Sequence, residues 1–276
     1  MMQNTYIPHS DAAFSRTELL LGTTALEHLG QAHILLCGIG GVGSWAAEIL
    51  VRSNIKHLTI IDPDTVKASN INRQLPALHS TIGETKGIVL KQRLHDISPQ
   101  AEITFSPTRL TPENIPDILA QQSWDYIIDA IDERPPKLAL IQQAIQQHIP
   151  IISSMGSANK IIPSAIQIAD ISDTYGCSMA KLLRKNLKKV GITKGLKVVF
   201  SPELSILLAN GKYCGTNQEE PGEKRPLGTI SYMPALFGLY CASEVIQDLL
   251  KKLPPLPRKG NETPKGKKEK INTASC

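Results

Sequence analysis

The sequence is poor in cysteine, in aromatic residues and in long apolar runs. Its cysteines are odd in number, widely scattered and never spaced as Cys-x-x-Cys: Cys37, Cys177, Cys214, Cys241 and Cys276. Such a set forms no disulfide framework, which favours a reducing, cytoplasmic environment. No apolar run reaches the ~18 residues of a membrane-spanning helix. The N-terminal stretch lacks the basic start and apolar core of a secretory signal, so we expect no membrane partner.

The composition is otherwise that of a globular protein. Apolar residues make up 41% and charged residues 20% of the 276 residues, which excludes collagen, a coiled coil and wholesale disorder. Only 4% of the residues are aromatic, so aliphatic side chains must fill the core. A chain of this length buries most of the surface that it exposes when unfolded, so it needs no disulfide bonds for stability.

Positive charge is concentrated in two segments. From Lys251 to the C-terminus there are eight basic and two acidic residues, or +6, which leaves 22 basic and 23 acidic residues, or −1, in the rest of the chain. Residues 181–197 contain seven basic residues and no acid. Such a run is either a solvated helix face or a surface for an acidic partner.

Apolar stretches alternate with helix-like stretches from residue 33 to residue 154. We expect buried strands at 33–37, 57–61, 101–105, 125–131 and 149–154, and helices at 86–97, 112–122 and 135–147. The first thirty residues are also predicted to be helical, with apolar positions at Phe14, Leu19, Leu20, Leu26 and Leu29. Continuous apolar strands between helices are typical of a parallel sheet covered on both faces. The sequence therefore predicts the α/β class: a Rossmann-like, doubly wound, mostly parallel sheet with helices on both faces and a C-terminal extension packed on it.

The alternation ends near Gly156. Apolar stretches remain after it, and the one at 233–250 is long enough for a helix packed on the sheet. We expect a single domain over residues 1–252, with 156–252 as its substrate-facing part. Residues 253–276 are rich in proline and lysine and have few apolar side chains, so we expect a disordered basic tail.

A glycine-rich turn follows the first expected strand and precedes a helix. Its glycines are Gly38, Gly40, Gly41 and Gly43. Glycine lets the backbone turn sharply and approach a phosphate, which the N–H groups of a helix N-terminus attract. Asp62 ends the next strand, where a carboxylate can accept hydrogen bonds from ribose hydroxyls. The alternative is that the glycines only allow tight packing of helix on strand. The order of strand, glycine turn, helix and then Asp62 favours a nucleotide-binding site. It does not distinguish a site for NAD from one for ATP.

The residues after Asp62 favour ATP. The candidate nucleotide-binding residues there are Asp64, Asn70, Arg73, Gln74 and Lys86. A hydride-transferring enzyme has no need of an arginine and a lysine at the phosphates. Attack on a phosphoryl group does need them, because charge builds on the α-phosphate and on pyrophosphate as they part.

Asp132 follows the fourth expected strand, at the same edge of the sheet as the glycines. A carboxylate there can hold Mg²⁺ through one or two oxygens. Taken singly, these residues have structural alternatives: Asn70 as a turn residue, Arg73 as a surface charge and Asp132 as a helix N-cap. Their joint order and spacing favour the functional interpretation.

These stretches resemble a known family. GIGGVGSWAAE, Asp62, SNINRQ, Lys86 and DAID are similar to the adenylation domain shared by ubiquitin-like activating enzymes and by bacterial enzymes that activate sulfur-carrier proteins. The closer resemblance is to the tRNA threonylcarbamoyladenosine dehydratase family, through SSMGSANKIIPSAIQIADIS, MAKLLRKNLKKVGI, LKVVF and PLGTISYMPALFG. It covers residues 14 to 250. That family adenylates the carboxylate of a threonylcarbamoyl group on an adenosine beside the tRNA anticodon. The carbamoyl nitrogen then closes on the activated carbonyl and gives a cyclic hydantoin, AMP and pyrophosphate.

The resemblance implies ATP and Mg²⁺ as cofactors and an adenylation domain over residues 1–252. The four glycines would cradle the phosphates, and Asp62 would bind ribose. Asn70, Arg73 and Lys86 would contact the triphosphate, and Asp132 would hold Mg²⁺; Arg73, Lys86 and Asp132 are the candidate catalytic residues. The partners implied are tRNA, a second copy of the chain in a homodimer, and a cysteine-desulfurase or sulfur-acceptor system.

The chain departs from the family patterns at several points. Relatives that activate carrier proteins often have two zinc-binding Cys-x-x-Cys pairs, and their absence here predicts no structural zinc. Ala158 and Ile162 stand where close relatives usually have glycine and aspartate. Many relatives have an arginine near DAID, and here either Arg134 or Lys137 could take its place. The wider family also has an N-terminal arginine, for which Arg16 is the one candidate in this sequence.

A catalytic cysteine would need an exposed thiol of lowered pKa. Cys37 and Cys241 lie in apolar stretches and are expected in the core, and Cys276 lies in the tail. Cys177 and Cys214 lie in expected loops and are the candidates for a reactive thiol, although buried or incidental cysteines are commoner. An intramolecular ring closure requires none, since proximity supplies much of the acceleration.

The basic segment is the candidate tRNA-binding surface. If it is helical, spacings of four residues gather Lys181, Arg184, Lys185, Lys188 and Lys189 on one broad face that can follow a phosphate backbone. Three other functions remain open: adenylation of a carrier protein's C-terminus, a non-catalytic tRNA or sulfur-transfer adaptor, and a NAD-linked oxidoreductase. The missing Cys-x-x-Cys pairs argue against the first. The intact Arg73, Lys86 and Asp132 argue against the other two.

Overall fold

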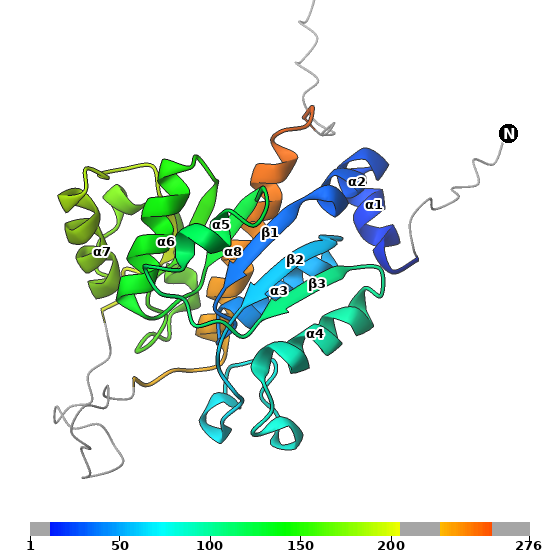
Figure 1. Cartoon of the computed structure of the whole chain (residues 1–276), viewed down its shortest axis with the longest axis horizontal. Coiled ribbons are helices and arrows are strands. Elements are labelled where there is room, and N and C mark those ends of the chain that lie inside the picture. The colour runs from blue at the N-terminus through cyan, green and yellow to red at the C-terminus, as the bar shows by residue number, and fades with distance from the viewer. Residues whose placement is uncertain (1–11, 205–226, 256–276) are drawn as a thin grey trace, which may run out of the picture.

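The computed structural model describes residues 12–204 and 227–255 (Figure 1). The strands are β1 His33–Cys37, β2 His57–Ile61, β3 Glu102–Ser106, β4 Tyr126–Asp129, β5 Ile151–Ser154, β6 Gln167–Asp170 and β7 Lys197–Phe200. The α-helices are α1 Ser15–Leu21, α2 Thr23–Gln31, α3 Gly43–Arg52, α4 Lys86–Ile97, α5 Ile115–Leu119, α6 Arg134–Gln146, α7 Ser178–Lys189 and α8 Tyr232–Leu250. Short 3₁₀ turns lie at Ala12–Phe14, Ala68–Asn70, His79–Thr81, Pro163–Ala165 and Ile171–Asp173.

The described strands form one sheet in the order β3-β2-β1-β4-β5-β7-β6. Every pairing is parallel except that of β6 with β7. The order reverses between β1 and β4, and in an open parallel sheet this reversal opens a crevice at the carboxyl ends of the strands. The predicted α/β class and mostly parallel, doubly wound sheet are confirmed, and residues 167–200 extend the same sheet.

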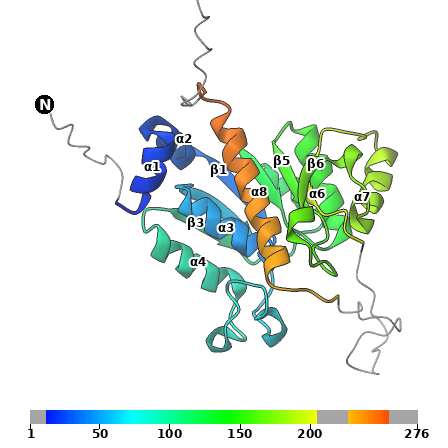
Figure 2. The same ribbon diagram turned by 180° about the vertical axis from the view of Figure 1, so that it is seen from behind.

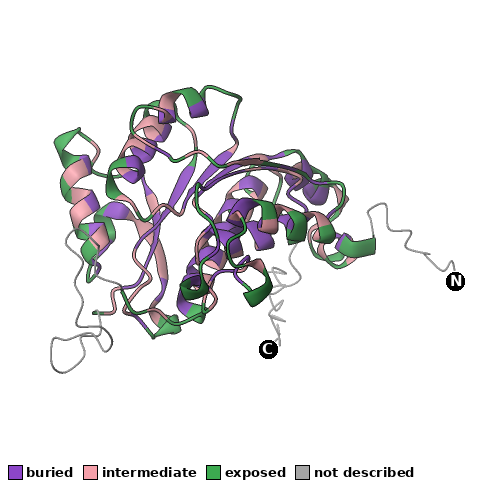
Figure 3. Cartoon of the chain, turned by 60° about the horizontal axis from the view of Figure 1, so that its bottom comes forward, coloured by how far each residue is buried: buried purple, intermediate pink, exposed green. Residues whose placement is uncertain are grey.

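Two apolar layers cover the sheet. Alternate residues of a strand face opposite sides, so Ile34 and Leu36 join one buried cluster while Leu35 and Cys37 join the other. The first cluster packs α2, α3, α4 and α8 against the sheet, and the second packs α5, α6 and α7. Figure 2 shows α8 lying beside α3 on one face, and Figure 3 shows that the strands between the layers are mostly buried.

Several predicted boundaries shift. The strand expected at 125–131 is Tyr126–Asp129, so Asp132 lies in the loop beyond it. The strands expected at 101–105 and 149–154 are Glu102–Ser106 and Ile151–Ser154. The helix expected at 112–122 is only Ile115–Leu119, and turns replace its ends.

The N-terminal helix is broken at Gly22, whose φ of 82° lies in the left-handed region that favours glycine. Beyond the break, Leu26 and Leu29 are buried as expected. Before it, Leu19 and Leu20 are 59% and 77% exposed. The expected tail lies outside the described residues from 256 onward.

Candidate active site

The glycine turn joins β1 to α3 at the carboxyl edge of the sheet. Gly38 has φ 87°, and a Cβ on it would lie 2.8 Å from the carbonyl oxygen of Ala130. A Cβ on Gly43 would lie 1.8 Å from the carbonyl oxygen of Gly38. Gly43 does not line the pocket described next. Its role here is close packing of helix on turn, whereas Gly38, Gly40 and Gly41 face the cavity.

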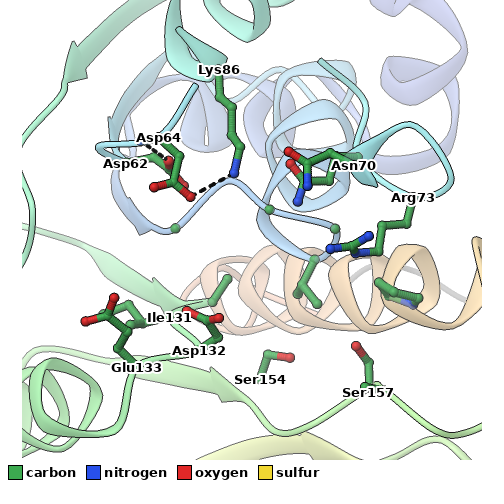
Figure 4. Close-up of a pocket in the computed structure, with 18 of the residues that line it drawn as sticks. Asp62, Asp64, Asn70, Arg73, Lys86, Ile131, Asp132, Glu133, Ser154 and Ser157 are labelled. Carbon is green, nitrogen blue, oxygen red and sulfur yellow. Dashed lines mark hydrogen bonds and ion pairs between the residues drawn. The ribbon is translucent and has the colours of Figure 1, made fainter. Parts of the chain in front are cut away.

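A cavity of about 730 Å³ opens at this edge. Its walls are the segments that follow the five strands β1 to β5 and the segment before α8, together with residues from α4, α6, α7 and α8. Figure 4 shows charged side chains from distant parts of the sequence around it. The structure brings these predicted residues into its lining: Gly38, Gly40, Gly41, Asp62, Asp64, Asn70, Arg73, Gln74, Lys86 and Asp132.

One end of the pocket is built around Asp62 and Lys86. The carboxylate of Asp62 accepts the backbone N–H of Ile39 at 2.8 Å and that of Asp64 at 2.9 Å, so it ties the glycine turn to the end of β2. Burial raises the pKa of Asp62 against these two hydrogen bonds. Lys86 is buried, and its Nζ lies 2.9 Å from Oδ2 of Asp64. The half-exposed carboxylate of Asp64 therefore holds the ammonium group of Lys86 at the pocket wall.

Arg109 and Glu133 extend this charged wall. Nη1 of Arg109 lies 2.6 Å from Oε1 of Glu133, and its Nη2 lies 3.9 Å from Oδ1 of Asp64. Both residues line the pocket, and the sequence analysis missed them. No spacing rule links them to the glycine turn, because β3 and β4 bring them there from separate loops.

The centre of the pocket contains Asn70, Arg73 and Gln74. Nη1 of Arg73 donates to the carbonyl oxygen of Ser69 and to Oδ1 of Asn72, both at 2.9 Å. Burial lowers the pKa of the Arg73 guanidinium, and the facing charge of Asp132 opposes that shift. Gln74 is buried, and its Oε1 has no hydrogen-bond partner among the described residues.

Asp132 faces Arg73 across the cavity (Figure 4). It is exposed, lines the pocket and makes no hydrogen bond or ion pair with any described residue. A single free carboxylate beside a phosphate site fits Mg²⁺, which binds through one or two carboxylates and the substrate phosphates. No cluster of three or more His, Cys, Asp or Glu side chains that could hold a metal occurs within residues 12–204 and 227–255.

Neither candidate for the arginine near DAID lines the pocket. Arg134 is exposed. Lys137 is buried, and its Nζ lies 2.9 Å from Asp129 and donates to the carbonyl oxygen of Ile131 at 3.0 Å. Lys137 therefore holds the loop that carries Asp132. Arg16 is exposed on α1 and is also absent from the pocket lining.

Uncharged residues from the segments after β5 and before α8, and from α7 and α8, also line the pocket: Ser154, Met155, Gly156, Ser157, Ala158, Met179, Leu227, Thr229 and Pro234. Ala158 thus reaches the pocket, whereas Ile162 is 46% exposed and its amide donates to Glu203. The sequence analysis did not single out Ser157, Met179 or Thr229. The resemblance marked their stretches but assigned them no role.

The basic segment forms the predicted helix, α7. Lys181, Lys185, Lys188 and Lys189 are exposed. Arg184 differs, because its guanidinium donates to the carbonyl oxygen of Thr174 at 2.7 Å and to the hydroxyl of the same residue. It anchors α7 to the preceding loop, so only the four lysines remain as a free basic face.

The described cysteines are buried. Burial raises the pKa of Cys37, and it raises that of Cys241 to about 12. Cys177 was expected in a loop and lies buried just before α7, which is not the environment of a reactive thiol. Cys214 and Cys276 lie outside the described residues.

The fold and the pocket define a nucleotide-binding α/β protein whose site lies at the reversal point of a parallel sheet. The chain belongs to the ThiF family, whose model matches residues 14–275. It is 39% identical over 241 residues to the tRNA threonylcarbamoyladenosine dehydratase of Bacillus subtilis, an alignment that covers 86% of this chain and 94% of that protein.

Two solved structures of the Escherichia coli tRNA N6-threonylcarbamoyladenosine dehydratase are also similar. The complex with ATP has a TM-score of 0.78 at 34% identity and covers 89% of this chain and 98% of that one. The complex with AMP has a TM-score of 0.79 at 33% identity and covers 90% and 99%. The resemblance drawn from the sequence motifs is confirmed. None of the helices in the described ranges combines the length and the apolar character needed to cross a bilayer.

Proposed function

We propose that this chain is an ATP-dependent tRNA threonylcarbamoyladenosine dehydratase. The observation that carries the proposal is the convergence of Arg73, Lys86 and Asp132 on one pocket beside the glycine turn. Two cations and one unpaired carboxylate around a phosphate site suit nucleotidyl transfer. The similarity to tRNA threonylcarbamoyladenosine dehydratases over most of the chain indicates the acyl substrate.

The reaction has two steps. First, a carboxylate oxygen of the threonylcarbamoyl group attacks the α-phosphorus of ATP, an O–P bond forms, and pyrophosphate leaves. Then the carbamoyl nitrogen attacks the activated carbonyl carbon, a C–N bond forms as the C–O bond to AMP breaks, and the nitrogen loses its proton. The second step is intramolecular, so orientation supplies much of its acceleration.

The pocket residues divide these tasks. Asp62 would accept the ribose hydroxyls, and Gly40 and Gly41 would let the triphosphate approach the backbone at the N-terminus of α3. Arg73 and Lys86 would stabilise the charge that develops as pyrophosphate leaves. Asn70 and Gln74 would donate hydrogen bonds from their side-chain amide groups to the same phosphates.

Asp132 would hold Mg²⁺ against the phosphates. The ion would neutralise phosphate charge during nucleotidyl transfer. The protein supplies the position of Asp132, through the buried pair of Lys137 with Asp129 and the hydrogen bond from Lys137 to Ile131.

The tRNA would lie along α7. Met179, in the first turn of this helix, lines the pocket. Lys181, Lys185, Lys188 and Lys189 follow on the exposed side. At 1.5 Å per residue, Lys189 lies roughly 15 Å along the helix from Met179, so phosphates near the modified adenosine can contact the lysines while its acyl group enters the pocket.

We also propose a homodimer, and the exposed Leu19 and Leu20 on α1 are suited to contact a second copy. Sedimentation of the wild type against a Leu19→Ser, Leu20→Ser variant tests this, since the variant should sediment as a monomer. A cytoplasmic location and a sulfur-transfer partner stay predictions from the sequence.

Adenylation of a carrier protein is the alternative function. The exposed lysines of α7 beside the pocket favour a nucleic acid over a carrier protein. The deciding experiment is nucleoside mass spectrometry of tRNA bearing threonylcarbamoyladenosine after incubation with the protein, ATP and Mg²⁺. Loss of one water from the modified nucleoside supports the proposal; adenylated carrier protein with unchanged tRNA overturns it.

A further inference from the structure

Arg109 and Glu133 form an ion pair across the ends of two other strands. Arg109 follows β3 and Glu133 follows β4, and the sheet order places β2 and β1 between these two strands. Neighbouring strands lie about 4.8 Å apart, so β3 and β4 are separated by roughly 14 Å. Nη1 of Arg109 nevertheless lies 2.6 Å from Oε1 of Glu133. The pair therefore bridges the part of the crevice where β2 leads to Asp62 and β1 leads to the glycine turn.

The loop that carries Arg109 is anchored to the core. Leu110 is buried and belongs to the same apolar cluster as Leu35 of β1 and Leu140 of α6. The chain therefore leaves β3, at the edge of the sheet, and crosses the ends of β2 and β1. Nδ2 of Asn114 donates to the carbonyl oxygen of Arg109 at 2.9 Å. The side chain of Arg109 thus starts from a fixed point at the pocket wall.

A nucleotide bound at the glycine turn would place its base beside this ion pair. In the proposed function the triphosphate contacts Arg73 and the ribose contacts Asp62, so the base extends beyond Asp62. Figure 4 shows Ile131 and Glu133 at the same end of the cavity as Asp62, whereas Arg73 lies at the other end. Apolar residues within three positions of Asp62, Arg109 or Glu133 in the sequence also line the cavity: Ile61, Leu110, Ile131 and Pro136. Apolar side chains of this kind suit the flat faces of a purine.

The ion pair holds the guanidinium group of Arg109 by its edge. The N–H groups of a guanidinium lie in its plane, so carboxylates bind the edge and leave the two faces free. Nη1 is engaged by Glu133, and Nη2 lies 3.9 Å from Oδ1 of Asp64. The side chain is 59% exposed and lines the cavity, so a bound ring can reach one of these faces. Arginine stacks readily on aromatic planes.

We infer that Arg109 binds the base of the nucleotide by stacking its guanidinium group on the ring, and that Glu133 positions that group. The inference rests on the proposed function, which supplies ATP and the acyl-adenylate as the nucleotides. It adds the contact that retains the AMP part after pyrophosphate has left. Arg73 and Lys86 act on the departing phosphates, whereas contacts to the base and the ribose persist through ring closure.

The test compares nucleotides that share a base but differ in phosphates. Binding of ATP and of AMP to the wild type and to Arg109→Ala is measured by isothermal titration calorimetry, with Mg²⁺ left out for AMP so that Asp132 plays no part. Loss of a stacked contact should weaken both nucleotides by a similar factor, about tenfold. Binding of tripolyphosphate, which has no nucleoside, should not change. The thermal midpoint should hardly move, because an exposed ion pair contributes little to folding.

Two further substitutions separate stacking from charge. Arg109→Tyr keeps a flat group and loses the charge, so AMP affinity should stay within about threefold of the wild type. Arg109→Lys keeps the charge and loses the flat group, so it should bind AMP as weakly as Arg109→Ala does. Glu133→Gln should weaken AMP binding less than Arg109→Ala, and it should add nothing in the double variant if Glu133 acts through Arg109.

Three results overturn the inference. One is an unchanged AMP affinity in Arg109→Ala. Another is recovery of AMP affinity by Arg109→Lys but not by Arg109→Tyr, which would make the contact electrostatic. The third is weaker binding of tripolyphosphate to Arg109→Ala, which would place Arg109 at the phosphates. A wild type that binds neither nucleotide refutes both this inference and the proposed function. A wild type that binds both nucleotides but leaves threonylcarbamoyladenosine in tRNA unchanged refutes the proposed function alone.

Discussion

The ammonium group of Lys137 on α6 lies 2.9 Å from the carboxylate of Asp129 at the end of β4, and both side chains are almost completely buried, at 2% and 0% exposure. The same carboxylate accepts the amide of Ile131 at 3.1 Å and the hydroxyl of Ser153 at 2.6 Å. One buried charge pair thus joins β4, β5 and α6 directly beneath the loop that carries Asp132. The pair is a structural support of the site and does not line it.

Lys137→Met should therefore destabilise the fold strongly. Removing one partner leaves Asp129 charged and buried, which typically costs about 3–5 kcal/mol. Urea unfolding followed by circular dichroism measures the change. Lys185→Met, an exposed lysine on α7, is the matched control and should change stability by less than about 0.5 kcal/mol. Adding Asp129→Asn to Lys137→Met removes the stranded charge and should recover a substantial part of the loss; no recovery would mean that shape, not charge, sets the cost.

Asp132→Asn should keep the fold and weaken Mg²⁺-dependent turnover. The substitution is nearly isosteric, and Asp132 makes no hydrogen bond or ion pair with a described residue, so stability should not change. The Mg²⁺ concentration for half-maximal turnover should rise by about tenfold or more. Glu133→Gln is the control, because Glu133 is adjacent and also lines the pocket but pairs with Arg109. Equal effects of the two changes would reject a specific metal role for Asp132.

Arg73→Ala should lower kcat much more than it weakens ATP binding. If the guanidinium stabilises charge that develops only in the transition state, its loss should cost about 10²–10³-fold in turnover. Arg73→Lys keeps a charge but loses the planar, five-donor geometry of the guanidinium, so it should recover only part of the activity. A raised KM for ATP with unchanged kcat would assign Arg73 to ground-state binding.

Asp248 predicts an acid dependence of stability. Burial opposes its ionisation, but hydrogen bonds from Lys197, Lys251 and Tyr126 outweigh burial and hold its pKa below the usual value. A lowered carboxyl pKa contributes stability above the unfolded-state pKa, and that contribution is lost as the pH falls through the folded-state pKa. Asp248→Asn should therefore cost about 1 kcal/mol near pH 6 and progressively less below about pH 4. A cost that stays constant between pH 6 and pH 3 in urea unfolding would contradict the charge-based explanation.

The sheet was predictable because its strands are apolar on both faces. The stretches His33–Cys37 and His57–Ile61 each contain three large aliphatic residues, and these two strands have the predicted ends. The convergence of the glycine turn, Asp62, Arg73 and Lys86 on one pocket was also predictable, since these residues follow strands in a fixed order.

Other parts depended on tertiary contacts that leave no local pattern. Arg184 has the same spacing as the lysines of α7, yet the loop at Thr174 binds it. Lys137 was a candidate counterpart of the arginine near DAID, but it pairs with a buried aspartate. Thr229 reaches the pocket only because Asn72 and Asn159, which are distant in sequence, hold its segment.

The four free lysines of α7 should supply most of the salt-sensitive tRNA affinity. The variant that tests this changes all four lysines to glutamine: Lys181→Gln, Lys185→Gln, Lys188→Gln and Lys189→Gln. It keeps Arg184, because that residue anchors the helix to Thr174. For every phosphate that a lysine no longer neutralises, the slope of log affinity against log salt should become shallower by about 0.7–0.9. Fluorescence anisotropy with labelled tRNA at several salt concentrations measures both the affinity and this slope. ATP binding should be unaffected, because none of the four lysines lines the pocket.

Deletion of residues 256–276 is the matched comparison, because it also removes positive charge. We expect this segment to attract tRNA only through a diffuse electrostatic field. The deletion should weaken tRNA binding less than the lysine variant does, and it should leave most of the salt dependence in place. An Arg184→Gln variant should instead lower the thermal midpoint by loosening α7, with a smaller effect on the salt slope. If the deletion abolishes tRNA binding while the four-lysine variant binds normally, α7 is a solvated helix face and the tRNA lies elsewhere.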